Sequence, residues 1–459
     1  MFQRSERRTA ARVRASRPSG RRRKLAIFPG AAIAVLLVGA GVASSQSPPG
    51  GGPFLTVAVN TTSDSLNPGP GKISLRKAFA MTNASPNNGN IVLQGGATYK
   101  LTVCSPAGQY NDTAGELTHT GAGQLTISGN HATIVQTCPG ARVIDQLGPA
   151  LMNLNDVSIT GGDQTLAPGG GVFASGGGEL DLKNSTVVGN YSAAAGGGVA
   201  AYGKVVLSGT TVRDNRSGEA QGGVATFGEA EIIKSTVADN TSTTNGGIEG
   251  ANQVVLIYAT VYGNTDPQLI AENGTLTSFG SVIGGPGGGA NCQVSIATHS
   301  LGYNFDSGDA GGSCKLAGPH DKVNSGNPLL TPEVGTGGVA VLAPGKGSPL
   351  LNAIPPRGCT ARGVLKSFIP VYSDITSDQL GTPRPQGAGC DVGSIEVLAH
   401  GRATACKDTT VKPSSLGRGR RTVTITVRVN GVPVVVRVKA RGPGIVNLST
   451  SFDGLVCRR

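Results

Sequence analysis

The sequence predicts an all-β chain whose body is a right-handed parallel β-helix, a solenoid of stacked coils of about 25 residues. Three observations support this prediction. Short segments rich in β-branched residues recur at a nearly constant spacing, glycine pairs recur between them, and the repeats carry no helical hydrophobic pattern. One coil cannot bury its own apolar side, so the coils must stack to form a core.

The repeated segments align on a terminal asparagine. They read LDLKNSTVVGN (180–190), VVLSGTTVRDN (205–215), AEIIKSTVADN (230–240) and VVLIYATVYGN (254–264). Stacked amides can bond neighbouring backbone and each other, so we interpret these asparagines as a structural ladder, formed by Asn190, Asn215, Asn240 and Asn264. The repeated threonines indicate packing at a corner of the coil; they are Thr186, Thr211, Thr236 and Thr260.

The net charge of +12 belongs to the two ends of the chain. Residues 1–24 carry a net charge of +9 and residues 402–459 carry +10, which leaves −7 on residues 25–401. Because the body is mildly acidic, the composition gives no reason to expect a nucleic-acid partner.

Residues 1–43 read as an export signal. A basic segment ending at Lys24 precedes an apolar stretch from Leu25 to Ala43, and small residues stand at Gly41 and Ala43. This order favours a cleaved signal peptide whose last residue is Ala43. An uncleaved signal-anchor is the alternative, and it is the one membrane attachment we expect. Residues 44–53 read as a linker, 54–397 as the β-helix and 403–459 as a small basic β module.

Eight cysteines in an exported chain predict disulfides, because exported proteins meet an oxidising environment. None lies in a Cys-x-x-Cys pair, so we expect no metal site and no cofactor. Sequence neighbours are usually spatial neighbours in a solenoid, which favours pairing in chain order. The expected pairs are Cys104–Cys138, Cys292–Cys314, Cys359–Cys390 and Cys406–Cys457.

Several motifs resemble those of exported bacterial β-helix proteins of the choice-of-anchor Q class. The resemblance covers roughly residues 55–397, and its most specific block is DQLGTPRPQGAGCDVGSIE (378–396). An earlier match is Ser300–Asn304, which reads SLGYN. The resemblance implies an exported, often surface-attached β-helix and no single activity. Asn352 departs from the aspartate usual in the family.

The head of the body also resembles this class, whose signature is of the Cys-Ser-Leu-Arg-Glu-Ala type. Here it reads SLRKA (74–78), with Ile73 in place of the cysteine and Lys77 in place of the acidic residue. Ser74 is a suitable N-cap for a short helix that would run to about Asn83. Such a helix would cover the open end of the solenoid, where an exposed strand edge invites aggregation.

The basic end of the chain predicts a hairpin. Residues 422–442 alternate around Asn430-Gly431, and Asn-Gly between alternating runs is a strong hairpin signal. Residues 442–454 would add a third strand or turn, as at the start of an immunoglobulin-like module. The net charge of +10 either belongs to a solvated surface or attracts anionic polymers of the cell envelope.

Catalytic signals are weak in this sequence. Asp214 and Asp239 hold equivalent positions one coil apart, and with Glu231 they are the best candidates for an acid pair. Arg213 is adjacent, but strict strand alternation would point its side chain the other way. None of the five histidines recurs in the repeats, so we interpret them as surface or structural residues.

We therefore expect a non-catalytic exported β-helix that acts in adhesion or carbohydrate contact. Its partner would be a polysaccharide or an anionic envelope polymer. The rival interpretation is a polysaccharide lyase or glycoside hydrolase of the pectate-lyase-like architecture, using Asp214 and Asp239. The low aromatic content of 4% argues against a surface on which sugars stack.

Overall fold

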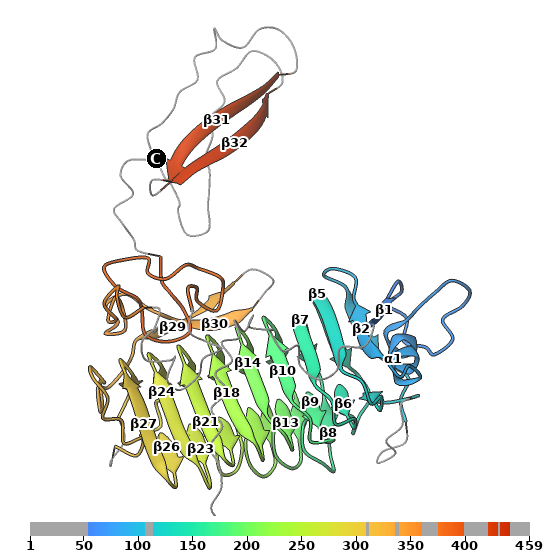
Figure 1. Ribbon diagram of the computed structural model, residues 1–459, viewed down its shortest axis with the longest axis horizontal. Helices are drawn as coiled ribbons and strands as arrows, with labels where there is room; N and C mark the ends of the chain where they lie inside the picture. Colours follow the sequence, from blue (N-terminus) through green and yellow to red (C-terminus); the bar gives the residue numbers. More distant parts are fainter. Residues whose placement is uncertain are drawn as a thin grey trace, which may run out of the picture. The chain divides into compact units, whose positions relative to one another are not determined.

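The computed structural model describes residues 54–105, 113–308, 312–335, 339–359 and 375–398, and the backbone of 421–429 and 432–440. The predicted signal (1–43), the linker (44–53), Cys406 and Cys457 lie outside the described residues. The described part is all-β apart from one short α-helix, and its body is a parallel β-solenoid (Figure 1).

One side of the solenoid is an eight-stranded parallel sheet, to which each coil contributes one three-residue strand. Eight strands therefore mark eight coils. In chain order they are β4 (Leu117–His119), β6 (Ile144–Gln146), β9 (Val172–Ala174), β13 (Val199–Ala201), β17 (Val224–Thr226), β20 (Ile248–Gly250), β23 (Leu269–Ala271) and β26 (Cys292–Val294). We call this the short-strand sheet.

The opposite side is a 17-stranded sheet with a bend in each coil. We call it the long sheet. The strands that come first in each coil, of which β5 and β7 continue through the bend, are β1 (Phe54–Ala58), β2 (Asn88–Val92), β5 (Leu125–Gln136), β7 (Met152–Thr160), β10 (Leu180–Lys183), β14 (Val205–Ser208), β18 (Glu229–Ile233), β21 (Gln253–Ile257), β24 (Thr275–Phe279) and β27 (Ala297–Gly302). The other strands are β3 (Thr98–Leu101), β11 (Thr186–Val188), β15 (Thr211–Arg213), β19 (Thr236–Ala238), β22 (Thr260–Tyr262), β25 (Val282–Gly284) and β28 (Phe305–Asp306). A third, small sheet holds β8 (Asp163–Gln164), β12 (Tyr191–Ser192) and β16 (Arg216–Ser217).

The strand register matches the spacing of the sequence repeat. Leu182 pairs with Leu207 and Leu207 with Ile232, and both pairings are parallel. Val187, Val212, Val237 and Val261 form a second such row through β11, β15, β19 and β22. The repeat thus places like residues directly above one another, as a parallel β-solenoid requires.

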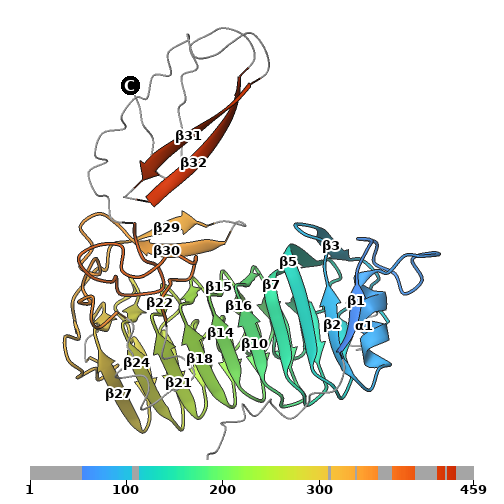
Figure 2. The same ribbon diagram turned by 45° about the horizontal axis from the view of Figure 1, so that its top comes forward.

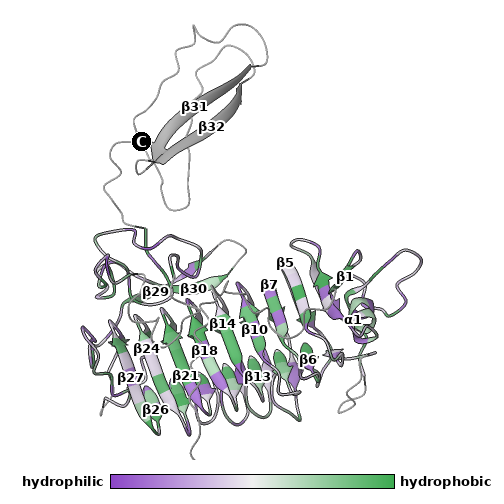
Figure 3. Cartoon of the chain, in the orientation of Figure 1, coloured by the Kyte–Doolittle hydropathy of each residue, from purple (hydrophilic) through white to green (hydrophobic). Residues whose placement is uncertain are grey.

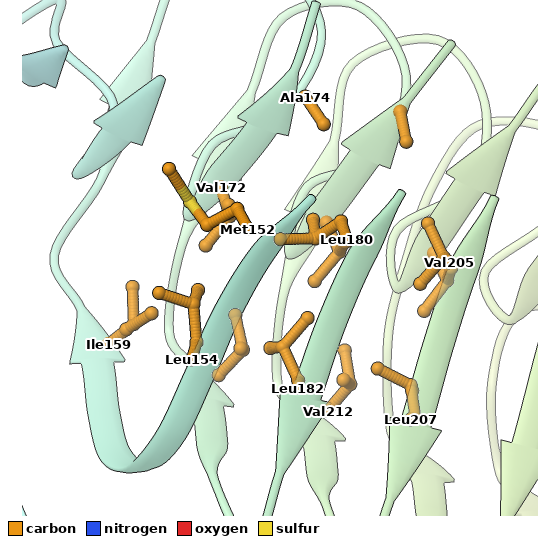
Figure 4. Packing of buried hydrophobic residues seen from close by; sticks show 14 of the residues in the cluster. Met152, Leu154, Ile159, Val172, Ala174, Leu180, Leu182, Val205, Leu207 and Val212 are labelled. Atoms are coloured by element: carbon orange, nitrogen blue, oxygen red, sulfur yellow. The ribbon is translucent and has the colours of Figure 1, made fainter. Parts of the chain in front are cut away.

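The core consists of the inward rows of the two sheets. Leu180 and Leu182 on β10 and Val172 on β9 are at most 1% exposed, and so are their partners in adjacent coils. Figure 4 shows these side chains pointing into the space between the sheets. Apolar and polar positions alternate along the strands (Figure 3), because successive side chains of a strand face opposite sides.

Helix α1 (Leu75–Asn83) begins where the sequence predicts it. The Ser74 hydroxyl accepts a hydrogen bond from the amide of Lys77, as an N-cap does. Leu75, Ala78 and Phe79 are buried in the main hydrophobic cluster, on strands β1, β2 and β4. The neighbouring Arg76 is fully buried, and its guanidinium bonds both carboxylate oxygens of Asp64.

After the last coil the chain turns back over the outer side of the long sheet (Figure 2). We call residues 339–359 and 375–398 the covering segment. Near its start, β30 (Ala340–Pro344) pairs antiparallel with β29 (Leu330–Val334). Leu350, Ile354 and Val392 of this segment pack on Ile257 and Phe279 of the long sheet. This second cluster buries outward-facing apolar residues of strands β14 to β28.

The threonine row anchors the covering segment. Gln379 donates its side-chain amide to Thr211 (2.7 Å) and accepts from the Thr236 hydroxyl (2.6 Å). Ser394 bonds Thr260 through both its amide and its hydroxyl. The threonines therefore do more than pack at a corner, because they hydrogen-bond residues of the covering segment.

A buried ion pair holds the covering segment together. Arg384 Nη1 donates to Glu396 (2.9 Å), and both side chains are at most 1% exposed. The guanidinium also donates to the carbonyls of Asp391 and Gly393 and stacks on the Tyr258 ring, with 4.2 Å from its carbon to the ring centroid. A buried charge needs partners of this kind to be tolerated, and here both Nη atoms are bonded while the buried Nε makes no hydrogen bond.

In the basic end of the chain, β31 (Arg421–Val429) and β32 (Val432–Ala440) form an antiparallel pair. The predicted turn at Asn430-Gly431 and the predicted third strand at 442–454 lie outside the described residues.

Three disulfides join Cys104 to Cys138, Cys292 to Cys314 and Cys359 to Cys390. These are three of the four pairs expected from the sequence. Disulfides of this kind indicate an extracytoplasmic environment. Within the described ranges, no helix has the length and apolar character needed to cross a bilayer.

Candidate functional site

The asparagine residues form a continuous ladder inside the solenoid. Asn215 accepts at Oδ1 from the amide and the side-chain NH2 of Asn190, both at 3.0 Å, and Asn240 and Asn264 extend the pattern. Each side-chain NH2 also donates to a carbonyl of the preceding coil, such as that of Val187. All four residues are buried, so the ladder satisfies backbone groups and presents no amide to a ligand.

Asp214 and Asp239 do lie close together, but the sequence prediction for Arg213 is wrong. Its guanidinium donates to Asp214 (2.8 Å) and to Asp239 (3.2 Å) and so bridges the two carboxylates. The reason is that Asp214 has a φ of 53°, in the left-handed region, which breaks the strand alternation on which the prediction depended. Burial, opposed by Arg213, raises the pKa of Asp239.

The third residue of the predicted acid cluster is elsewhere. Glu231 faces outward on β18, where it accepts from Lys204 Nζ at 2.8 Å. Asp214 and Asp239 therefore lie together, whereas Glu231 belongs to a separate charged cluster with Lys204.

The histidines differ in their surroundings. His119 is buried and satisfied, with contacts from its ring nitrogens to Asn83 and Gly123. His131 Nδ1 lies 2.5 Å from Asp156 Oδ1, beside Ser158 on the outer side of the long sheet. No group of three or more potential metal ligands occurs among the residues the structure describes.

An exposed row of aromatic rings lies at the corner between the short-strand sheet and the long sheet. Phe173 and Tyr202 have ring centroids 5.3 Å apart, and Tyr202 and Phe227 have centroids 5.5 Å apart. Tyr202 is 50% exposed and Phe227 is 68% exposed. We call these three residues the aromatic corner.

The repeat positions these rings on consecutive coils. Val199 and Val224 are paired core residues of the short-strand sheet, and Tyr202 and Phe227 each follow three residues later, where the chain leaves the sheet. Phe173 comes from the middle of β9 in the preceding coil and is 6% exposed. Tyr202 and Phe227 therefore lie in one row along the solenoid axis, whereas Phe173 belongs to the neighbouring row of Ala200 and Ala225.

A buried ion cluster supports the first ring. The guanidinium carbon of Arg142 lies 4.8 Å from the centroid of Phe173, a cation–π distance. Arg142 also contacts Glu116 (3.3 Å) and Asp145 (3.2 Å), and all three charged side chains are at most 7% exposed. Burial raises the pKa of Glu116 to about 7, while Arg142 opposes that change.

Carboxylates line the long-sheet side of the aromatic corner. Glu179, Lys204 and Glu229 occupy equivalent positions on three coils, one residue before the paired core positions of β10, β14 and β18. Lys204 Nζ lies 2.8 Å from Glu231 and 3.7 Å from Glu229. Burial, followed by the effect of Glu179, raises the pKa of Asp181 to about 7.

A second carboxyl pair continues the corner in the direction of the later coils. Glu249 faces outward on β20 in the register of Phe173, and Glu272 follows β23 at the position that Tyr202 and Phe227 occupy. Burial, and then the adjacent Glu272 carboxylate, raise the pKa of Glu249 to about 7. The two side chains share a hydrogen bond.

Composition therefore misled the sequence prediction about aromatic residues. A content of 4% is low, but three of the rings lie at one exposed corner. The signal available in the sequence was positional, because Tyr202 and Phe227 both stand three residues after the valine that follows a glycine pair.

In comparisons with known proteins, no family model, no curated protein and no solved structure matched this chain.

Proposed function

We propose that this protein is an exported, non-catalytic β-helix that contacts polysaccharide through the aromatic corner. The observation that carries the proposal is the pair of exposed rings Tyr202 and Phe227 on consecutive coils, with the buried ring of Phe173 beside them. Aromatic rings combine a large apolar surface with an electron-rich face, which suits the C–H groups of a sugar ring. The ring planes of Phe173 and Tyr202 meet at 69° and those of Tyr202 and Phe227 at 50°, so Tyr202 and Phe227 would contact a sugar chain with differently oriented surfaces.

The surroundings of the rings support the same function. Carboxylates and Lys204 beside the corner supply hydrogen-bond partners for sugar hydroxyls. Arg142 supports the ring of Phe173, which in turn contacts Tyr202, so little conformational freedom of this part of the corner is lost on binding. A long chain could lie along the solenoid axis and contact several coils at once.

Export and surface attachment complete the proposal. The basic and apolar segments of residues 1–43 and the three disulfides support secretion. The motifs at 74–78, 300–304 and 378–396 support membership of the choice-of-anchor Q class. We infer a right-handed coil, since parallel crossover connections are almost always right-handed. We further infer that α1 covers the first coil, as its buried residues Leu75 and Phe79 suggest.

The basic residues 402–459 would form a small β module that acts as an electrostatic tether and holds the protein near anionic polymers of the envelope. Retention on such a polymer should fall with rising salt and should vanish when residues 402–459 are deleted. Retention that survives the deletion would exclude the tether.

Binding of soluble polysaccharides by residues 44–459 tests the main proposal. Tyr202→Ala and Phe227→Ala should weaken binding about tenfold or more together, as expected when two stacking contacts are lost. Tyr191→Ala is the matched control, because Tyr191 is a half-buried tyrosine at another corner of the solenoid. Equal losses in the control and in the corner variants would contradict the proposal.

A polysaccharide-degrading activity is the alternative, and the bridged pair Asp214–Asp239 is the observation that favours it. A raised pKa on Asp239 would suit a general acid. Release of new reducing or unsaturated ends, lost in Asp239→Asn, would establish this activity in place of the non-catalytic one.

A further inference from the structure

The carboxylates around the aromatic corner carry an inference about the ligand itself. Six acidic residues border the three rings, and we call them the acidic border: Glu179, Asp181, Glu229, Glu231, Glu249 and Glu272. Lys204 lies among them, and Lys183 stands two residues beyond Asp181 on β10. The corner therefore carries six carboxyl groups and two ammonium groups.

The positive charges within the border are already partly neutralised. Lys204 contacts both Glu229 and Glu231. Burial by itself lowers the pKa of Lys204, but the contact with Glu231 raises it overall, so its charge is held by that carboxylate. The remaining carboxyl groups occur as two pairs, Asp181 with Glu179 and Glu249 with Glu272.

The two carboxyl groups of each pair repel each other when both are ionised. The neighbouring carboxylate disfavours ionisation of Asp181 and of Glu249, in addition to the effect of burial. A cation placed at either pair would relieve this repulsion. The aromatic faces attract cations as well, because the ring quadrupole is negative above the ring.

We propose that the aromatic corner and its acidic border bind a polysaccharide that carries free amino groups, such as a glucosamine polymer. The proposal rests on the function proposed above and specifies its ligand. Sugar rings would stack on Tyr202 and Phe227, while the ammonium groups would meet the carboxylates on both sides of the rings. An anionic polysaccharide would instead be repelled from this corner.

The test compares three soluble hexamers on the full exported chain: glucosamine, N-acetylglucosamine and galacturonate, which are cationic, neutral and anionic. We expect the glucosamine hexamer to bind at least about tenfold more tightly than the neutral one and to weaken as salt is raised. We expect no binding of the galacturonate hexamer at the aromatic corner.

Two carboxylates of the border that reach solvent, Glu229 and Glu272, supply the variant. Glu229→Gln combined with Glu272→Gln should weaken the glucosamine hexamer about threefold to tenfold more than it weakens the neutral hexamer. The matched control is Glu219→Gln combined with Glu333→Gln, since both residues are exposed and lie outside the border. This control should bind like the unchanged protein.

The outcomes separate the two proposals. Equal affinity for the cationic and neutral hexamers, with both reduced by Tyr202→Ala, would overturn the charge selectivity and leave polysaccharide contact standing. No binding of any hexamer would overturn both proposals. A lysine hexapeptide that binds more tightly than the glucosamine hexamer would show that the corner recognises basic peptide, which also overturns the sugar ligand.

Discussion

Hydrogen bonds of single asparagines hold neighbouring coils together in this protein. Asn215 serves three coils, because it accepts from Asn190, donates to Val187 and donates to Asn240. All these groups are buried, where an unpaired donor or acceptor costs about 1–3 kcal/mol. The ladder is therefore a stabilising device, and its repetition follows from the repetition of the coil.

The first prediction concerns this ladder. Asn215→Ala should lower the free energy of unfolding by about 2–4 kcal/mol, because it leaves the Asn190 amide and the Val187 carbonyl without partners. Denaturant unfolding measures the change. Asn273→Ala is the matched control, because Asn273 is exposed at a corner, and it should stay within about 0.5 kcal/mol of the unchanged protein.

Glu249 gives a prediction about pH. Its pKa is about 7 in the folded protein and has an ordinary value of 4.5, so the folded state binds the proton more tightly. Its contribution to stability is complete below about pH 4.5 and is lost as the pH rises to about 7. Glu249→Gln should remove this loss.

Thermal unfolding of both proteins between pH 4 and pH 8 provides the measurement. The stability of Glu249→Gln relative to the unchanged protein should increase over this range. Two curves that stay parallel would show that the Glu249 carboxyl titrates normally. The raised pKa values of Asp181 and Glu116 make stability fall with rising pH in the same direction, so the effect of Glu249 is taken from the difference between the two proteins.

Residue positions were predictable where the repeat fixed them and unpredictable where the backbone departs from it. The asparagine ladder follows from equal spacing. The bridge from Arg213 to Asp214 and Asp239 depends on a left-handed φ, which spacing does not reveal. The aromatic corner was missed because composition counts rings without placing them.

At the level of secondary-structure elements, the covering segment is held on the long sheet by side chains that the pattern of strands does not predict. Arg384 bonds Glu396 and two carbonyls while it stacks on Tyr258 of the solenoid. Because these groups are buried, the pair ties the fold of the segment to its contact with the long sheet.

We therefore predict that Arg384→Ala destabilises the protein by about 3–5 kcal/mol, since Glu396 is left as an unpaired buried charge. Hydrogen exchange should show the loss first in residues 375–398, before the coils. Arg357→Ala is the control, because Arg357 is exposed in the same segment. Unchanged protection of residues 375–398 in the Arg384 variant would contradict this role.

Helix α1 could be predicted because Ser74 gives a local N-cap signal and the helix residues have the required apolar positions. The covering segment could be recognised only as a block of family-like sequence. Its contacts, such as Gln379 with Thr211 and Thr236, join residues more than 140 positions apart, and no local pattern encodes them.

At the scale of the whole molecule, the solenoid explains how a surface can be built from few aromatic residues. Rows of equivalent positions run along the axis, so Tyr202 and Phe227, at equivalent positions of adjacent coils, lie next to each other. The same geometry places the acidic border beside the rings. The fold class followed from the 25-residue period, whereas the surface depends on which residues occupy outward positions that the period leaves open.

The position of a bound oligosaccharide tests the central claim most directly. A crystal structure of residues 44–459 with a bound glucosamine hexamer would locate it. Our account predicts sugar rings stacked on Tyr202 and Phe227, running along the solenoid axis, with amino groups next to Glu229 and Glu272. A hexamer bound at Asp214 and Asp239, or anywhere away from the aromatic corner, would contradict it.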